Sequence, residues 1–222
     1  MSTTHIPRHV LPVIVLAQLL GTSLWFAVNA VMPDLQRELG WSTAAVGTLT
    51  SALQFGFILG TLVFALLALA DRFAPRQVFL VCALAGAGCT VGAWAMVRDQ
   101  DALMLWRFAT GFFLAGIYPV GMKIAAQWYS KGLGGALGFL IGALVLGSAS
   151  PHALRALGDA LPWPTLMLGV AALAALGGVL LYLFTGDPPG AVARVTTLQW
   201  RALGTVWTDR KVRSSVLGYF GH

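Results

Sequence analysis

The stretch LALADRFAPRQVF, residues 67–79, holds two arginines and an aspartate between two long apolar segments. The first segment ends at Asp71 and Arg72, Pro75 interrupts the chain, and apolar residues resume after Arg76. Charged side chains are costly in hydrocarbon and collect near membrane surfaces. This stretch therefore predicts a short turn at a membrane surface, joining two membrane-spanning helices.

The composition of the whole chain agrees with a lipid environment. The 222 residues are 58% hydrophobic and only 10% charged, whereas soluble domains carry about 25% charged residues. The net charge of +6 comes from scattered basic residues, which do not form the track that nucleic acid requires. We therefore predict membrane lipid, and no nucleic acid, as a partner.

The sequence contains no pattern that indicates an enzyme, a metal site or a bound cofactor. Neither a His-Glu-x-x-His metal motif nor a glycine-rich phosphate loop is present. A membrane-embedded serine protease would need a Gly-x-Ser-Gly nucleophile and a histidine on another helix. The segment GSASPH, residues 147–152, has its serine and histidine in the wrong order and too close together.

The spacing of the charges predicts six membrane-spanning helices. A helix needs about 20 apolar residues to cross the hydrocarbon. The apolar runs are apolar on every face, unlike the alternating strands of a membrane barrel. The sequence therefore predicts an all-α membrane protein with a six-helix transmembrane bundle in residues 1–184, with spans at about 10–33, 43–70, 77–97, 102–127, 133–155 and 164–184.

Basic residues are unevenly divided between the two sides of these spans. With a cytoplasmic N-terminus, the inner segments hold nine of them: Arg8, Arg72, Arg76, Lys131, Arg194, Arg201, Arg210, Lys211 and Arg213. The outer loops hold three: Arg37, Arg98 and Arg155. Such a bias sets orientation. It predicts a multi-pass protein of the plasma (cell inner) membrane, with the N-terminus in the cytoplasm.

Two segments resemble signatures of the major facilitator superfamily. LADRFAPRQV, residues 69–78, is similar to that family's Gly-x-Leu-Ala-Asp-Arg-x-Gly-Arg-Arg loop between helices two and three; the matching residues are Leu69, Ala70, Asp71, Arg72 and Arg76. Leu67 and Ala74 replace its glycines, and Pro75 replaces a basic residue. RFATGFFLAGIYP, residues 107–119, resembles the fourth-helix signature. GALVLGSASPH, residues 142–152, is loosely similar to the nitrate/nitrite-porter-like branch.

The resemblance implies a fold and a function. Members have twelve helices in two six-helix halves around a central cavity, and each half contains inverted repeats. The chain would then be the N-terminal half of a secondary active transporter that moves a small solute by alternating access. The resemblance also implies that Asp71, Arg72 and Arg76 form a loop that gates the conformational change.

Polar residues within the predicted spans are candidates for the substrate or coupling site. A cation inside a span normally faces a partner or a watery cavity; the alternative for Arg107 is that it reaches the headgroups. Arg107 predicts a small anion as the substrate. The full set of candidates is Arg107, Asn29, Trp25, Tyr118, Lys123 and His152.

Glycines at helical spacing predict close helix packing. Gly134, Gly138 and Gly142 lie four residues apart on the fifth span, and Gly111 lies on the fourth. Small residues at this spacing let helix backbones approach closely. We therefore predict that these four glycines contact neighbouring helices.

The C-terminal part of the sequence differs from the spans. Residues 185–213 read as a cytoplasmic loop with a possible amphipathic helix, and the apolar residues 214–222 read as the start of a seventh span. These features predict a fragment whose partner is a C-terminal six-helix half. The alternatives are a complete six-helix protein that pairs as a homodimeric transporter, and a membrane scaffold that transports nothing.

Overall fold

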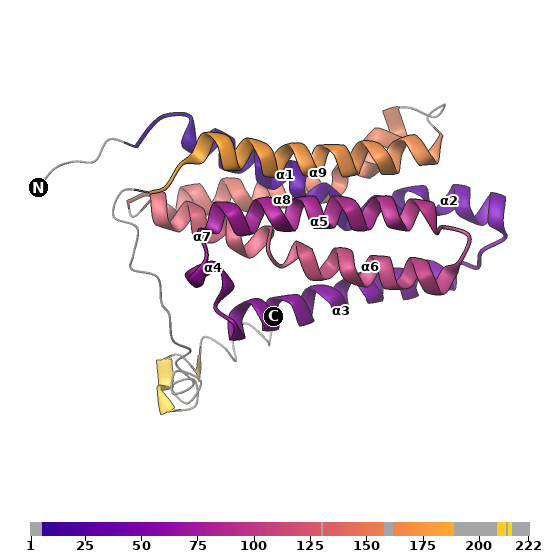
Figure 1. Cartoon of the computed structure of the whole chain (residues 1–222), viewed down its shortest axis with the longest axis horizontal. Helices are drawn as coiled ribbons and strands as arrows, with labels where there is room; N and C mark the ends of the chain where they lie inside the picture. Colours follow the sequence, from indigo (N-terminus) through magenta and orange to yellow (C-terminus); the bar gives the residue numbers. More distant parts are fainter. Residues whose placement is uncertain (1–5, 130, 158–161, 189–207, 212, 215–222) are drawn as a thin grey trace, which may run out of the picture.

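The computed structural model of the chain describes residues 6–129, 131–157, 162–188, 208–211, 213 and 214. Within them, six helices are long and apolar enough to cross a membrane. They run along the long axis of one elongated bundle (Figure 1). The prediction of an all-α fold with six membrane helices is therefore confirmed.

Two of the six spans are interrupted and four are single helices. The first span consists of α1 (Val10–Thr22), the 3₁₀ turn η1 (Ser23–Phe26) and α2 (Ala27–Leu39). The fourth consists of α6 (Gln100–Leu114) and α7 (Tyr118–Trp128). The others are α3 (Ala44–Leu66), α5 (Pro75–Ala95), α8 (Leu133–Leu157) and α9 (Trp163–Thr185), and the short helix α4 (Leu69–Arg72) joins α3 to α5.

Local sequence explains several helix ends. The Asp99 side chain accepts backbone hydrogen bonds from Asp101 and Ala102 at 3.0 and 3.1 Å, which satisfies free donors at the start of α6. Pro75 opens α5, where its missing N–H costs nothing. Gly40 ends α2 with φ of 68°, a left-handed conformation that glycine adopts without strain.

The first span continues six residues beyond its predicted end at residue 33. Its last turns carry Asp34, whose Oδ1 accepts hydrogen bonds from Arg37 at 2.6 Å and from Arg155 of α8 at 2.7 Å. Pairing removes much of the cost of placing a carboxylate against the bundle. The helix therefore persists through a charged stretch that the spacing of charges alone marks as a loop.

The helices follow a fixed order around the bundle. The second span, α3, packs against α6, which packs against α5; α5 packs against α9, α9 against α1, and α1 against α8. Large apolar side chains cover much of the outer surface, as lipid contact requires. Examples are Phe55, Leu105, Leu146 and Leu183, which are 63%, 67%, 64% and 64% exposed.

Glycines bring α3 and α6 into backbone contact. A Cβ atom built on Gly111 would lie 1.9 Å from the carbonyl oxygen of Leu53. On the facing helix, a Cβ on Gly56 would lie 2.0 Å from the carbonyl oxygen of Phe108. Both distances are far below van der Waals contact, so only glycine fits at these two positions.

The glycine stripe of α8 does not make the contact that the sequence predicts. A Cβ on Gly134, Gly138 or Gly142 would meet no atom within 4 Å among the described residues. The buried side of α8 instead carries Leu140 and Gly147, and a Cβ on Gly147 would lie 2.2 Å from the carbonyl oxygen of Leu19. Helical spacing identified a stripe of small residues correctly, but the bundle uses a different side of the helix.

The remaining predictions concern the C-terminal part of the chain. The amphipathic segment lies mostly outside the described residues, which include only 208–211, 213 and 214 of this region. Of the predicted seventh span, only Ser214 is described. Both features therefore stay predictions.

Candidate functional site

The first span is interrupted at η1, and two hydroxyl groups explain the position of the break. Thr22 Oγ1 donates a hydrogen bond to the carbonyl of Gln18 at 2.8 Å, and Ser23 Oγ donates to the carbonyl of Leu20 at 2.6 Å. Hydroxyls that bond back to earlier carbonyls often bend helices. The 3₁₀ turn that follows redirects the next carbonyls. The predicted span at about 10–33 therefore contains a 3₁₀ turn, and Val10–Leu39 as a whole is long and apolar enough to cross a membrane.

Arg107 of α6 reaches across the bundle to this break. Its guanidinium donates hydrogen bonds to the carbonyls of Leu24 and Trp25, at 3.3 and 2.8 Å, and to Asn29 Oδ1 at 3.3 Å. The residue is only 1% exposed, which excludes the alternative that it reaches the headgroups. The carbonyl end of α1 carries partial negative charge, so the break supplies acceptors for a buried cation.

The charge of Arg107 is not neutralised by a carboxylate. The residue forms no ion pair within the part of the chain that the structure describes. Its Nε atom is also buried without a hydrogen-bond partner there. Two backbone carbonyls and one amide oxygen are therefore the acceptors that hold the cation among the described residues.

Aromatic and amide side chains lie next to the break. The rings of Trp25 and Phe57 have centroids 4.9 Å apart at an angle of 54°. The Nδ2 group of Asn29 donates to Thr50 Oγ1 at 2.7 Å while its Oδ1 accepts from Arg107. Trp25, Asn29 and Phe57 are all half-buried. The structure thus joins Arg107, Trp25 and Asn29, three of the sequence-predicted candidates, in one cluster that we call the break cluster, together with Thr50 and Phe57.

Two further candidates have different surroundings. His152 of α8 is exposed, and its ring lies 6.2 Å from that of Phe26, the last residue of η1. Tyr118 begins α7, after α6 has ended at Leu114. The fourth span is therefore interrupted between Arg107 and Tyr118, and the two residues lie on separate helices.

Lys123 lies at the end of the bundle that carries α4, away from the break cluster. Its ammonium group donates a hydrogen bond to Asp71 Oδ1 in an ion pair. Arg76 pairs instead with Asp187 at 2.9 Å and stands over the ring of Tyr182, 5.4 Å from its centroid. Within the turn at residues 71–76, Asp71 therefore pairs with the fourth span, whereas Arg76 pairs with a residue that follows the sixth span. These contacts tie α4 to α7, and α5 to the end of α9.

Comparison with known proteins identifies the family of this chain. Residues 14–221 match the model of the Major Facilitator Superfamily. The chain belongs to the major facilitator superfamily. This confirms the resemblance drawn from the signatures at residues 69–78 and 107–119, while similarity to the nitrate/nitrite-porter-like branch stays a prediction.

The chain is also similar to a curated transporter. The gallate transporter of Pseudomonas putida is 26% identical to this chain over 176 residues, which is 74% of this chain and 37% of that protein. The chain therefore spans little more than a third of the length of this curated relative.

The structure adds two residues that the sequence did not single out, Thr50 and Phe57, and shows the surroundings of a third, Gln18, which the sequence did single out as a polar residue within a span. Thr50 and Phe57 of α3 complete the break cluster, but nothing in the local sequence separates them from ordinary span residues. Gln18 of α1 gave a signal, as an amide in an apolar run. It is fully buried, and neither polar atom of its side chain has a partner among the described residues. A Cβ on Gly121 of α7 would lie 2.1 Å from its Oε1 atom.

Proposed function

We propose that the chain forms half of a secondary transporter that carries a small aromatic carboxylate by alternating access. The observation that carries the proposal is the buried cation Arg107, which has no carboxylate partner among the described residues and donates to the backbone carbonyl of Trp25, whose ring pairs with that of Phe57. A positive potential favours a carboxylate, and aromatic side chains favour a flat ring in stacked or tilted contact. Membership in the superfamily supports transport, and the name of the gallate transporter supports the substrate class.

In this proposal Arg107 does not contact the substrate directly but attracts it through its charge. Three acceptors already hold its guanidinium, so the carboxylate would sit beside Asn29 and feel the cation across a short, poorly screened distance. The ring would lie against Trp25 and Phe57. Arg107 therefore has two roles: it holds the interrupted first span in shape, and it supplies the field that selects an anion.

The turn at residues 71–76 would control the conformational change. The ion pair Asp71–Lys123 and the contacts of Arg76 with Asp187 and Tyr182 join three spans at one end of the bundle. These pairs are partly exposed, so each contributes little stability and can break as the transporter changes state. From the bias of basic residues, we place this end in the cytoplasm, in the plasma (cell inner) membrane.

A second six-helix bundle would complete the cavity. The unoccupied stripe of Gly134, Gly138 and Gly142 on α8 offers it a close approach, and the exposed rings and chains of α3, such as Phe55 and Ile58, offer apolar area. The variant Gly138→Cys tests whether that second bundle belongs to the same polypeptide or to a second copy of the chain. Crosslinking within one longer polypeptide supports a C-terminal half, whereas a crosslinked pair of identical chains supports a homodimer.

Uptake by proteoliposomes that contain the full-length protein tests the substrate class. We expect uptake of radiolabelled gallate or benzoate, competed by other aromatic carboxylates. Phe57→Leu should raise KM about 2- to 12-fold, since aromatic pairs contribute about 0.5–1.5 kcal/mol. Phe184→Leu, at an exposed position of α9 outside the break cluster, is the matched control. Uptake of neutral solutes only, or equal KM values for the two variants, would reject the proposal.

A further inference from the structure

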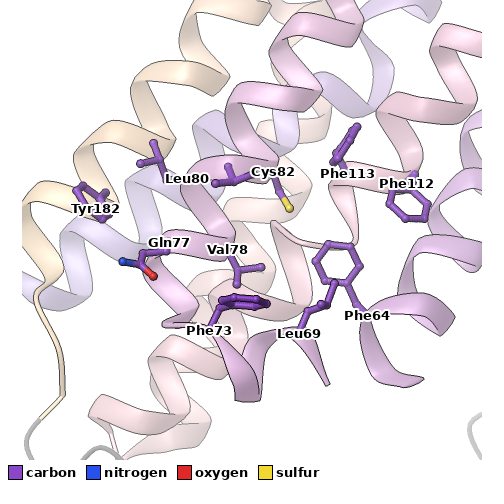
Figure 2. A pocket seen from close by; sticks show the side chains of 11 residues that line it. Phe64, Leu69, Phe73, Gln77, Val78, Leu80, Cys82, Phe112, Phe113 and Tyr182 are labelled. Atoms are coloured by element: carbon purple, nitrogen blue, oxygen red, sulfur yellow. The ribbon is translucent and has the colours of Figure 1, made fainter. Parts of the chain in front are cut away.

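A groove in the outer surface of the bundle lies apart from the break cluster. It has a volume of about 590 Å³ and is bounded by α3, α4, α5, α6 and α9. Figure 2 shows Phe64, Phe112 and Phe113 on one side and Tyr182 on the other, with Leu69 and Phe73 at the end near α4. Of its lining side chains, Gln77 and Tyr182 alone carry oxygen or nitrogen.

The groove is open to the surroundings of the bundle rather than sealed within it. Phe73 and Val81, which line it, are 56% and 60% exposed. Val81 lies on α5, and Phe73 lies in the turn between α4 and α5. In a membrane such an opening faces lipid tails, because water is absent at that depth.

The end of the groove near α4 lies among charged residues that balance one another, with one exception. Asp71 pairs with Lys123, and Arg76 pairs with Asp187. Arg72, on the same short helix as Leu69 of the groove, is exposed and forms no ion pair with any residue that the structure describes. An exposed cation without an ion-pair partner among the described residues therefore lies between Leu69 and Phe73 in the sequence, at the end of the groove where the charge pattern predicts a membrane surface.

The size of the groove distinguishes between occupants. A helix with its side chains is about 10 Å across and rises 5.4 Å per turn, so one turn occupies roughly 420 Å³. The groove would hold less than two turns of helix, far short of a membrane span. A narrow, flexible hydrocarbon chain can follow it along its length, and the cation at the rim matches an anionic headgroup.

We propose that this groove holds one acyl chain of an anionic phospholipid from the leaflet next to α4, with its phosphate at Arg72. The lipid is bound by apolar contact in the groove and by charge at the rim. It therefore bridges α5 and α9 to the turn at residues 71–76. A bound lipid would steady that turn in the conformation described here.

Native mass spectrometry of the full protein, stripped of lipid in mild detergent, tests this inference. The probes are dioleoyl phosphatidylglycerol, which is anionic, and dioleoyl phosphatidylcholine, which is zwitterionic. We expect one phosphatidylglycerol molecule to bind more tightly than the rest. Arg72→Gln should weaken that binding about fivefold relative to phosphatidylcholine, the factor expected for one basic residue at an anionic surface. Arg98→Gln, an exposed arginine at the other end of the bundle, should not.

A second variant tests the apolar part of the site. Val81→Trp would fill the groove and should remove the tight site for both lipids, whereas Val91→Trp, at an exposed position on the same helix outside the groove, should leave it intact. Circular dichroism identifies any variant that fails to fold. If Val81→Trp does not fold, Arg72→Gln still tests the proposal, because it changes only an exposed side chain. Equal lipid binding by wild type and Val81→Trp, or a groove filled by a second protein chain that phosphatidylglycerol cannot displace, would overturn the proposal.

Discussion

Replacement of Gly111 by alanine tests whether α3 and α6 truly meet through their backbones. The new Cβ would lie 1.9 Å from the carbonyl oxygen of Leu53 and 3.0 Å from the amide nitrogen of Phe57. Ordinary contact between these atoms is above 3 Å, and the neighbour is backbone rather than a side chain that can rotate. The two helices must therefore separate by more than 1 Å along their contact.

The expected cost follows from overpacking. Inserting a methyl group into a packed interior costs about 1–3 kcal/mol, and more where the backbone must move. We therefore expect Gly111→Ala to lose about 3 kcal/mol. For a domain of this size that lowers the midpoint of thermal unfolding by roughly 6–12 °C.

The thiols of Cys82 and Cys89 provide the assay, because their reaction with a fluorogenic maleimide speeds up as the bundle opens. These residues are 3% and 7% exposed. Gly47→Ala is the control: it lies on α3, and a Cβ there meets nothing within 4 Å, so removing a helical glycine should raise stability by up to about 1 kcal/mol. If Gly111→Ala melts at the same temperature as Gly47→Ala, the backbone contact between α3 and α6 is refuted.

Two further predictions concern the turn between α3 and α5. Ala68 has φ of 49°, a left-handed conformation in which glycine avoids a cost of about 1–2 kcal/mol. Ala68→Gly should therefore raise the unfolding midpoint by about 2–8 °C, while Ala65→Gly within α3 should lower it. A lower midpoint for Ala68→Gly would contradict the assigned backbone. For the pair Asp71–Lys123, either reversal alone (Asp71→Lys or Lys123→Asp) should slow transport, whereas the double reversal should restore it. Because both side chains are partly exposed, the thermal midpoint should move by only about 4 °C or less in all three variants. A double reversal that transports as slowly as the single ones would remove the pair from the gating turn.

The sequence predicted the spans well because lipid penalises charge so strongly. Every long stretch without a charged residue became a membrane helix, and the opening turn at residues 71–76 fell at a helix junction as expected. The first span is longer than predicted because Asp34 is paired with Arg155, a residue 121 positions away. No local pattern contains that contact.

The break cluster was predictable only in part. Arg107 and Asn29 stood out because a cation and an amide inside spans need partners. The break at η1 could not be recognised in the sequence, because Ser23–Phe26 contains neither glycine nor proline. The hydroxyl groups that bend the helix also occur in straight spans. The glycines show the same limit: spacing reveals that Gly111 and Gly138 are small residues on a helix, but only tertiary packing decides that Gly111 faces a neighbour and Gly138 does not.

Hydrogen–deuterium exchange of Arg107→Lys tests the central claim, that this arginine holds the interrupted first span together. A lysine keeps the charge but cannot bond the carbonyls of Leu24 and Trp25 in the same forked geometry. Losing one charge-assisted hydrogen bond costs about 1.5–3 kcal/mol, so the amides of residues 23–29 should exchange about tenfold to hundredfold faster. Residues 78–90 of α5, and the whole bundle of the control Arg98→Lys, should keep the wild-type rates. Unchanged exchange at residues 23–29 in Arg107→Lys would contradict the account.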